Sequence, residues 1–111
     1  MNSEVILIRQ AGLGHGDPQL GSILLINFLE ILSERPQLPR YIVLLNEGVT
    51  LAQEGSNAIE QLMKIQGRGV EIIACQTSVE YFALEDKICV GEIGNMQRIQ
   101  DILLSHQVLT I

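Results

Sequence analysis

The sequence predicts an α/β protein built around a parallel or mostly parallel sheet of five strands. Five short runs rich in apolar residues are spaced along the chain, at residues 5–8, 41–45, 70–74, 87–90 and 108–111. The first run is continuously apolar, which is typical of a strand that is buried on both faces, and the other four are similar. Helical patterns separate most of the runs, and this alternation of strand and helix indicates βαβ units.

The clearest helix is expected from Pro18 to about Ser33. Asp17 can cap its first turn, and Pro18 would occupy the first helical position, where its missing N–H costs nothing. The helix should stop before Pro36, because the residue before a proline disfavours helical geometry. Apolar residues cover most of its surface. We therefore expect part of this helix to lie in a contact between subunits.

Three more helical stretches are expected further along the chain, and the first of them is in two pieces. Thr50-x-x-Gln53 resembles a capping box, after which Gly55 breaks the turn. The next helix is expected to be capped by Ser56 and to end at Gly67.

The last two of these helices are expected to begin at Thr77 and near Asn95, and the first of the two should be short. The short one should begin at Thr77, where Thr77-x-x-Glu80 forms another capping box. The other should begin near Asn95, with apolar residues at helical spacing after it.

Length and composition limit the class of protein. The chain has 111 residues, which fits a single domain covering 1–111. Its net charge is −6 and its basic residues are scattered, which argues against a nucleic-acid partner. No apolar run reaches the length of about 18 residues that a membrane span needs. The segment Met1-Asn2-Ser3-Glu4 lacks the basic start of a signal peptide, so we expect a cytoplasmic protein with two reduced thiols.

Candidate functional residues follow the predicted strands. Ligands of parallel α/β sheets bind beyond the carboxyl ends of the strands. The segments after the first four predicted strands are 12–17, 46–49, 75–78 and 91–95, and we expect all four at one edge of the sheet. The candidate binding residues on these segments are Gly14, His15, Asp17, Asn46, Glu47, Gln76, Thr77, Ser78 and Asn95.

Cys75 is the only strong nucleophile among these segments and the candidate catalytic residue. It ends a buried strand and precedes an expected helix start, where free backbone N–H groups favour a thiolate. A thiolate can accept a sulfur atom as a persulfide and pass it on. The competing interpretation is a small buried hydrophobic residue. Cys89 lies in the middle of a predicted strand, which favours a structural role for it.

Other chemistries fit the sequence less well. The glycine-rich loop has Asp17 where a dinucleotide-binding fingerprint has its third glycine, and an acidic residue there repels phosphate. His15 could act as a base beside a thiol or be an idle loop residue. His106 suits a helix C-terminus, and Glu47 could bind a partner or be a solvated turn residue. The spacing of the His and Cys residues matches no zinc pattern, so neither a metal nor a cofactor is expected.

An ordered set of segments resembles the DsrE-like family, specifically its YedF-type domains. The matching segments are GHGDPQLG at 14–21, FL at 28–29, LLNEGV at 44–49, GVEI at 69–72 followed by Cys75-x-Thr77, YF-x-L at 81–84, and VGEIGNM at 90–96. The resemblance implies a three-layer α/β/α fold, a central parallel sheet and homo-oligomers. It also implies that Cys75 carries sulfur as a persulfide, with a TusA-like protein as exchange partner. YedF-type proteins are described as sulfurtransferase-like and are linked to selenium metabolism.

Two departures from that family pattern bear on function. The YedF-type segment usually reads Cys-Gly-Thr-Cys, whereas this chain has Cys75-Gln76-Thr77-Ser78. A disulfide between those two positions is therefore impossible, and Cys75 would hand sulfur to another protein or to a small thiol. The TusA-like domain that usually precedes this one does not occur in the sequence. The alternative to a sulfur carrier is therefore a non-catalytic oligomeric binding module, and a nucleotide or flavin binder ranks third.

Overall fold

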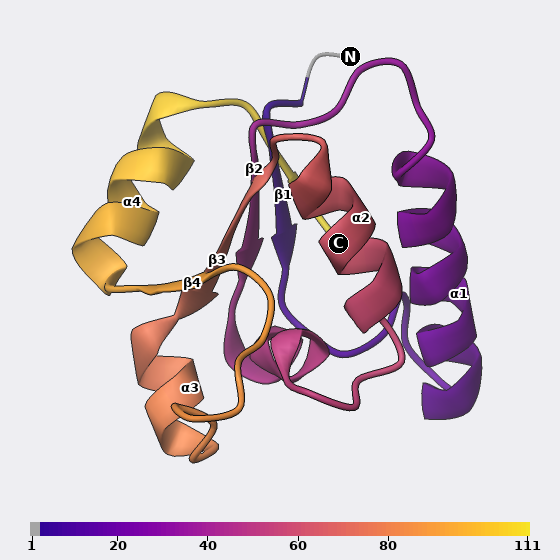
Figure 1. Cartoon of the computed structure of the whole chain (residues 1–111), viewed down its shortest axis with the longest axis horizontal. Helices are drawn as coiled ribbons and strands as arrows, with labels where there is room; N and C mark the ends of the chain where they lie inside the picture. The colour runs from indigo at the N-terminus through magenta and orange to yellow at the C-terminus, as the bar shows by residue number, and fades with distance from the viewer. Residues whose placement is uncertain (1–2) are drawn as a thin grey trace.

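Strands and helices alternate through the whole described part of the chain. The computed structural model describes residues 3–111, so two residues of the N-terminal segment considered above lie outside it (Figure 1). The elements in order are β1 (Val5–Ile8), α1 (Pro18–Leu32), β2 (Tyr41–Leu44), the 3-10 helix η1 (Asn46–Ala52), α2 (Ile59–Gly67), β3 (Glu71–Cys75), α3 (Gln76–Tyr81), β4 (Glu92–Gly94), α4 (Met96–Ser105) and β5 (Val108–Thr110).

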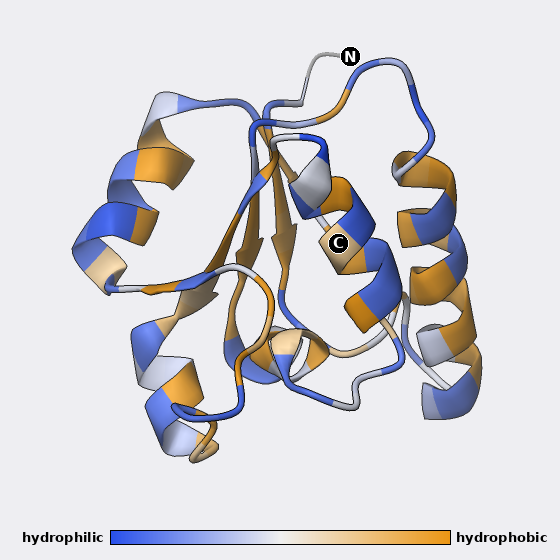
Figure 2. Cartoon of the chain, in the orientation of Figure 1, coloured by the Kyte–Doolittle hydropathy of each residue, from blue (hydrophilic) through white to orange (hydrophobic). Residues whose placement is uncertain are grey.

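The five strands form one sheet in the order β4-β3-β2-β1-β5. Every neighbouring pair is parallel, which confirms the predicted sheet. In β1, Ile6 pairs with Ile42 of β2 on one side and with Leu109 of β5 on the other. Strands β1 to β3 are almost entirely apolar, and Figure 2 shows them as the hydrophobic centre of the molecule.

Helices cover both faces of the sheet, so the fold has the three layers that the family resemblance implied. Figure 1 shows α1 and α2 on one side and α4 on the other. The chain steps in one direction from β1 to β2 to β3, and right-handed crossovers place α1 and α2 on the same face. It then returns from the β4 edge to the β5 edge, which places α4 on the opposite face.

Helix α1 begins and ends where the sequence predicts. The Asp17 carboxylate accepts a hydrogen bond from the backbone N–H of Leu20 at 3.0 Å, and Pro18 starts the helix. Ser33 is its C-terminal cap residue. Leu25 and Leu29 are buried in the core, whereas several other apolar side chains of this helix are exposed to solvent.

The predicted strand at 87–90 is wrong. This segment lies antiparallel to residues 52–54, where Glu54 N–H donates to the Lys87 carbonyl and Cys89 N–H donates to the Ala52 carbonyl. Its only β-bridge in the described chain joins Gln53 and Ile88, outside the main sheet. The fourth strand is instead Glu92–Gly94, a three-residue edge strand.

Three helix starts also differ from expectation. The N-cap residue of α2 is Ala58 and not Ser56, whose hydroxyl oxygen accepts from Ala58 N–H at 3.1 Å. Thr50 lies inside η1 and caps no helix, because its hydroxyl donates to the Glu47 carbonyl at 2.6 Å. Helix α3 begins one residue before Thr77, which puts Cys75 at the N-cap position. The helix starting after Asn95 is confirmed, since the side-chain oxygen of Asn95 accepts from Arg98 N–H at 2.9 Å.

The 3-10 helix η1 packs tightly against the end of β1. Leu45 N–H donates to the Ile8 carbonyl at 3.0 Å. A Cβ atom added at Gly48 would collide with the same carbonyl oxygen, so only glycine allows this approach. The contact fixes η1 at the carboxyl edge of the sheet. Among residues 3–111, no helix combines the length and apolar character needed to cross a bilayer.

Candidate functional site

The segments that follow β1, β2 and β3 line two neighbouring pockets at the carboxyl edge of the sheet. Glu47 borders the first pocket and Asn46 borders the second. These two residues are consecutive and begin η1, so the start of η1 separates the pockets. Three of the four predicted segments are therefore brought together.

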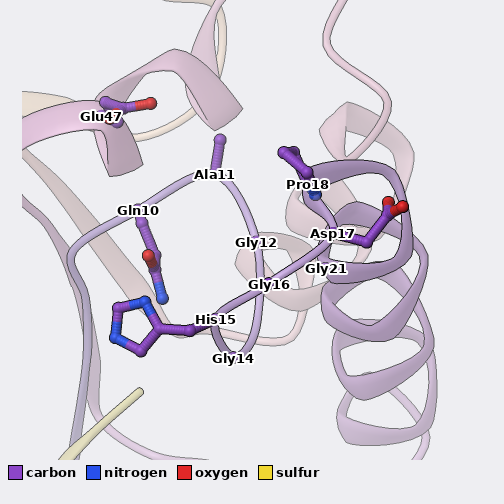
Figure 3. Close-up of a pocket in the computed structure, with 10 residues that line it drawn as sticks. All are labelled: Gln10, Ala11, Gly12, Gly14, His15, Gly16, Asp17, Pro18, Gly21 and Glu47. Carbon is purple, nitrogen blue, oxygen red and sulfur yellow. The ribbon is translucent and has the colours of Figure 1, made fainter.

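The first pocket has a volume of about 260 Å³ and is formed by the glycine-rich loop (Figure 3). Its lining residues are Gln10, Ala11, Gly12, Gly14, His15, Gly16, Asp17, Pro18, Gly21 and Glu47. The loop is held against α1 by a hydrogen bond from Leu13 N–H to the Gly21 carbonyl at 2.9 Å. A Cβ at Gly12 would lie 3.0 Å from the carbonyl carbon of Gly21, so glycine permits this close contact.

The charge of the first pocket is negative. Asp17 and Glu47 both line it, and the lining contains no Lys or Arg. Figure 3 shows the Asp17 side chain directed at the first turn of α1 and away from His15. Two carboxylates without a cation repel phosphate, which agrees with the mismatch between the loop sequence and a dinucleotide fingerprint. Within residues 3–111, no group of three or more His, Cys, Asp or Glu side chains is arranged to hold a metal ion.

The second pocket lies between η1 and α3 and has a volume of about 360 Å³. Asn46, Thr77, Ser78, Tyr81 and Phe82 line it. Asn46 has a φ of 53°, in the left-handed region, and its N–H donates to Ser78 Oγ at 2.9 Å. The rings of Tyr81 and Phe82 meet edge to face, with centroids 5.3 Å apart.

Cys75 lies beside this second pocket and does not line it. It is the last residue of β3, it pairs with Gly94 of β4, and it occupies the N-cap position of α3. Its side chain accepts no capping hydrogen bond, and the residue is only 2% exposed. The thiol is thus at the expected edge of the sheet, but closed off from solvent.

The remaining predicted residues lie outside the pockets. Gln76 is exposed on α3, where its side-chain amide donates to Glu80 at 3.4 Å. Asn95 caps α4. The segment 91–95 was expected to follow a strand, and that expectation is wrong because residues 92–94 are themselves β4.

The sequence interpretation missed two groups of residues. Tyr81 and Phe82 were not among the candidate site residues, although they follow Thr77 and Ser78 at a spacing of four and so share a helix face. The second miss is Cys89, which is exposed rather than packed in a strand. Its exposure follows from the incorrect strand at 87–90.

Comparisons with known proteins identify the fold. No family model matches the chain, and no curated protein matches it. The crystal structure of the ychN protein from E. coli is similar over 100% of both chains, with a TM-score of 0.71 and 23% identity. The protein of unknown function MTH1491 from Methanobacterium thermoautotrophicum is similar over 96% of both chains, with a TM-score of 0.69 and 15% identity. The chain therefore has the DsrE-like fold.

Proposed function

We propose that the chain is a cytoplasmic sulfur-relay protein that holds a persulfide on Cys75 and passes the sulfur to a partner protein. The observation that carries this proposal is the position of Cys75. It ends β3 at the N-cap position of α3, beside a pocket lined by the next residues on the same helix, Thr77 and Ser78. The family resemblance assigns sulfur transfer to this position, with a TusA-like protein as the exchange partner.

The transfer consists of two thiol exchanges without net oxidation. The Cys75 thiolate attacks the outer sulfur of a donor persulfide, forms Cys75–S–SH and releases the donor thiolate. An acceptor thiolate then attacks that outer sulfur, and Cys75 leaves as a thiolate. Ser78 stands at the family's second cysteine position, so both exchanges are intermolecular.

Access to Cys75 requires α3 to move, because the residue is only 2% exposed. Helix α3 has six residues, and a side-chain hydrogen bond, from Asn46 N–H to Ser78 Oγ, joins it to η1. Short elements with few ties open locally at lower free energy than the core. The proposal therefore includes local opening of α3 as the step that admits donor and acceptor.

The test uses a Cys89→Ser background, since Cys89 is exposed and would also take up sulfur. The protein is incubated with inorganic polysulfide, and its intact mass is measured before and after reduction. We expect one reducible sulfur atom on Cys89→Ser and none on Cys89→Ser/Cys75→Ser. Absence of added sulfur on the first protein, or equal addition to both, contradicts the proposal.

A second candidate function is a non-catalytic oligomeric binding module. The burial of Cys75 favours it, as does the outer surface of α1, where Leu20, Ile23 and Ile31 are 53%, 51% and 65% exposed. Apolar side chains at this exposure are typical of subunit contacts. This candidate predicts a homo-oligomer that survives Cys75→Ala and dissociates on Ile23→Lys/Ile31→Lys, measured by light scattering. A monomer at micromolar concentration would contradict it.

A further inference from the structure

We infer that the two pockets at the carboxyl edge form one docking surface for an extended, basic segment of a partner protein. An apolar side chain of that segment occupies the pocket of Tyr81 and Phe82, and a Lys or Arg side chain lies beside Glu47. This inference rests on the proposed function, because it names the chemistry of the partner that exchanges sulfur at Cys75.

The first step is the continuity of the two pockets. Asn46 and Glu47 are consecutive, and each borders one pocket. Their position is fixed from two sides. Gly48 packs against the Ile8 carbonyl of β1, and Asn46 N–H is bonded to Ser78 of α3. The contact with β1 holds this ridge at the edge of the sheet whether or not α3 opens, and a segment that crosses the ridge meets both pockets in a fixed order.

The second step is the apolar character of the pocket between η1 and α3. Tyr81 is 84% exposed, and its ring contacts Phe82 edge to face. An exposed aromatic residue beside an apolar pocket is typical of the anchor position of a protein interface. Thr77 lines the same pocket and is exposed, and none of the hydrogen bonds recorded for residues 3–111 uses its hydroxyl. That hydroxyl is placed to bond the backbone of a docked segment.

The third step is the charge of this edge of the molecule. The segments at the edge are 9–18, 45–56 and 76–91, and they carry six carboxylates and two cations. The carboxylates are Asp17, Glu47, Glu54, Glu80, Glu85 and Asp86, and the cations are Arg9 and Lys87. Six minus two leaves −4 of the chain's net −6 at this edge.

These six carboxylates are not neutralised by the ion pairs recorded in the described chain. All of those pairs use Lys64 or Arg98, together with Glu30, Glu34, Glu71 or Glu92. The acidic edge therefore presents a net negative potential around an aromatic anchor. Complementarity selects a basic partner surface and speeds its approach, whereas an acidic surface or a nucleic acid is repelled.

The test measures binding of a fluorescent peptide of alternating lysine and leucine by anisotropy at low ionic strength. The protein used is Cys75→Ser/Cys89→Ser, so that sulfur chemistry plays no part. We expect Tyr81→Ala and Glu47→Gln each to weaken binding by about tenfold, and Tyr81→Phe to retain it. Matched controls are Leu104→Ala, which removes a 79% exposed apolar side chain on α4, and Glu60→Gln, which removes an exposed carboxylate on α2. Both controls should bind as the parent protein does.

The result that overturns the inference is no binding, equal binding of a glutamate–leucine peptide, or equal weakening by the control substitutions. Amide chemical shifts give a second readout, which should change around Asn46, Glu47 and Tyr81 and not in the C-terminal half of α1, which lines neither pocket. Peptide binding without sulfur uptake on Cys75 would refute the proposed function and still support the docking surface. Sulfur uptake without peptide binding would refute the docking surface and still support the proposed function.

Discussion

The backbone N–H of Asn46 donates a hydrogen bond to the hydroxyl oxygen of Ser78, 32 residues further along the chain, at 2.9 Å. The bond ties the start of η1 to α3, so that the ends of β2 and β3 are joined above the sheet. Asn46 adopts a left-handed φ of 53°, which non-glycine residues other than Asn and Asp rarely take. The Ser78 oxygen therefore has a structural partner in this chain.

Removing that hydroxyl should loosen α3. We expect Ser78→Ala to lower the free energy of unfolding by about 1 kcal/mol, the usual worth of one hydrogen bond, measured by urea unfolding. The same substitution in the Cys89→Ser background should speed alkylation of Cys75. Thr77→Ala is the control, because Thr77 neighbours Ser78 and its hydroxyl makes no hydrogen bond within residues 3–111. Equal losses from both substitutions would show that the bond to Asn46 does not stabilise α3.

A substitution at the other end of α3 should act in the opposite direction. Ala83 follows the C-cap residue and has a φ of 56°, which costs an L-residue energy that glycine avoids. We expect Ala83→Gly to raise the free energy of unfolding by about 0.5–1 kcal/mol and to slow alkylation of Cys75. Gln100→Gly within α4 is the control, and it should lower stability by about 1 kcal/mol. A loss of stability from Ala83→Gly would contradict the prediction.

The close approach of η1 to β1 gives a third prediction. Gly48→Ala places a Cβ against the Ile8 carbonyl, and the backbone must shift to accommodate it. We expect a loss of about 1–3 kcal/mol in the free energy of unfolding, as for other overpacked sites. Gly67→Ala is the matched control, since a Cβ there meets nothing within 4 Å. The prediction fails if thermal unfolding of the two variants is the same.

The two thiols should differ strongly in reactivity. Cys89 is exposed and Cys75 is buried, so iodoacetamide should label Cys89 at least about tenfold faster in the folded protein. Peptide mapping by mass spectrometry at short times measures both rates. The difference should shrink as urea is raised below the unfolding transition, because opening of α3 exposes Cys75. Faster labelling of Cys75 in buffer would show that its thiol is open without any movement of α3.

Arg98 on α4 forms ion pairs with Glu71 of β3 and Glu92 of β4. Its guanidinium lies 2.7 Å from Glu92 and 3.1 Å from Glu71. The hydrogen bond with Glu92, aided by the charges of Glu92 and Glu71, raises the pKa of Arg98 above its usual value, although burial opposes this. A raised pKa means that this contribution is fully present at neutral pH and is lost only in strong alkali, as pH rises through the folded pKa.

Because these three side chains are half exposed, the bridge should contribute modestly. We expect Arg98→Gln to lower the free energy of unfolding by about 0.5–1 kcal/mol at low salt and by less at about 1 M salt, where the screening length is about 3 Å. Urea unfolding at both salt concentrations measures the difference. A loss that does not change with salt would assign the effect to packing of the side-chain stem.

The sequence was sufficient to predict the strands and helices that have strong local signals. The apolar run at 5–8 and the Asp17-Pro18 helix start needed no tertiary information. The run Ile88-Cys89-Val90 resembles a strand equally well, but its one β-bridge in the described chain, between Ile88 and Gln53, lies outside the main sheet. The fourth strand, β4, is only three residues long and too short to show a pattern. Thr50 satisfied a capping pattern, yet its hydroxyl bonds inside η1.

The location of the candidate site could be predicted from the sequence, but the solvent exposure of its residues could not. The rule for carboxyl ends of parallel strands correctly joins the segments containing His15, Glu47 and Thr77. The burial of Cys75 depends on how α3 packs, which spacing along the chain does not encode. The aromatic pair at 81–82 became a pocket wall only because η1 lies opposite it.

The order of strands in the sheet also bears on biosynthesis. Strand β1 is interior, and one of its two flanks is completed by residues 108–110, about a hundred positions later. During translation the open flank of Val5, Ile6 and Leu7 has no ladder partner until those residues leave the ribosome. An exposed apolar edge of this kind is prone to pair with other chains. The nascent polypeptide should therefore remain vulnerable to aggregation until β5 has emerged and paired with β1.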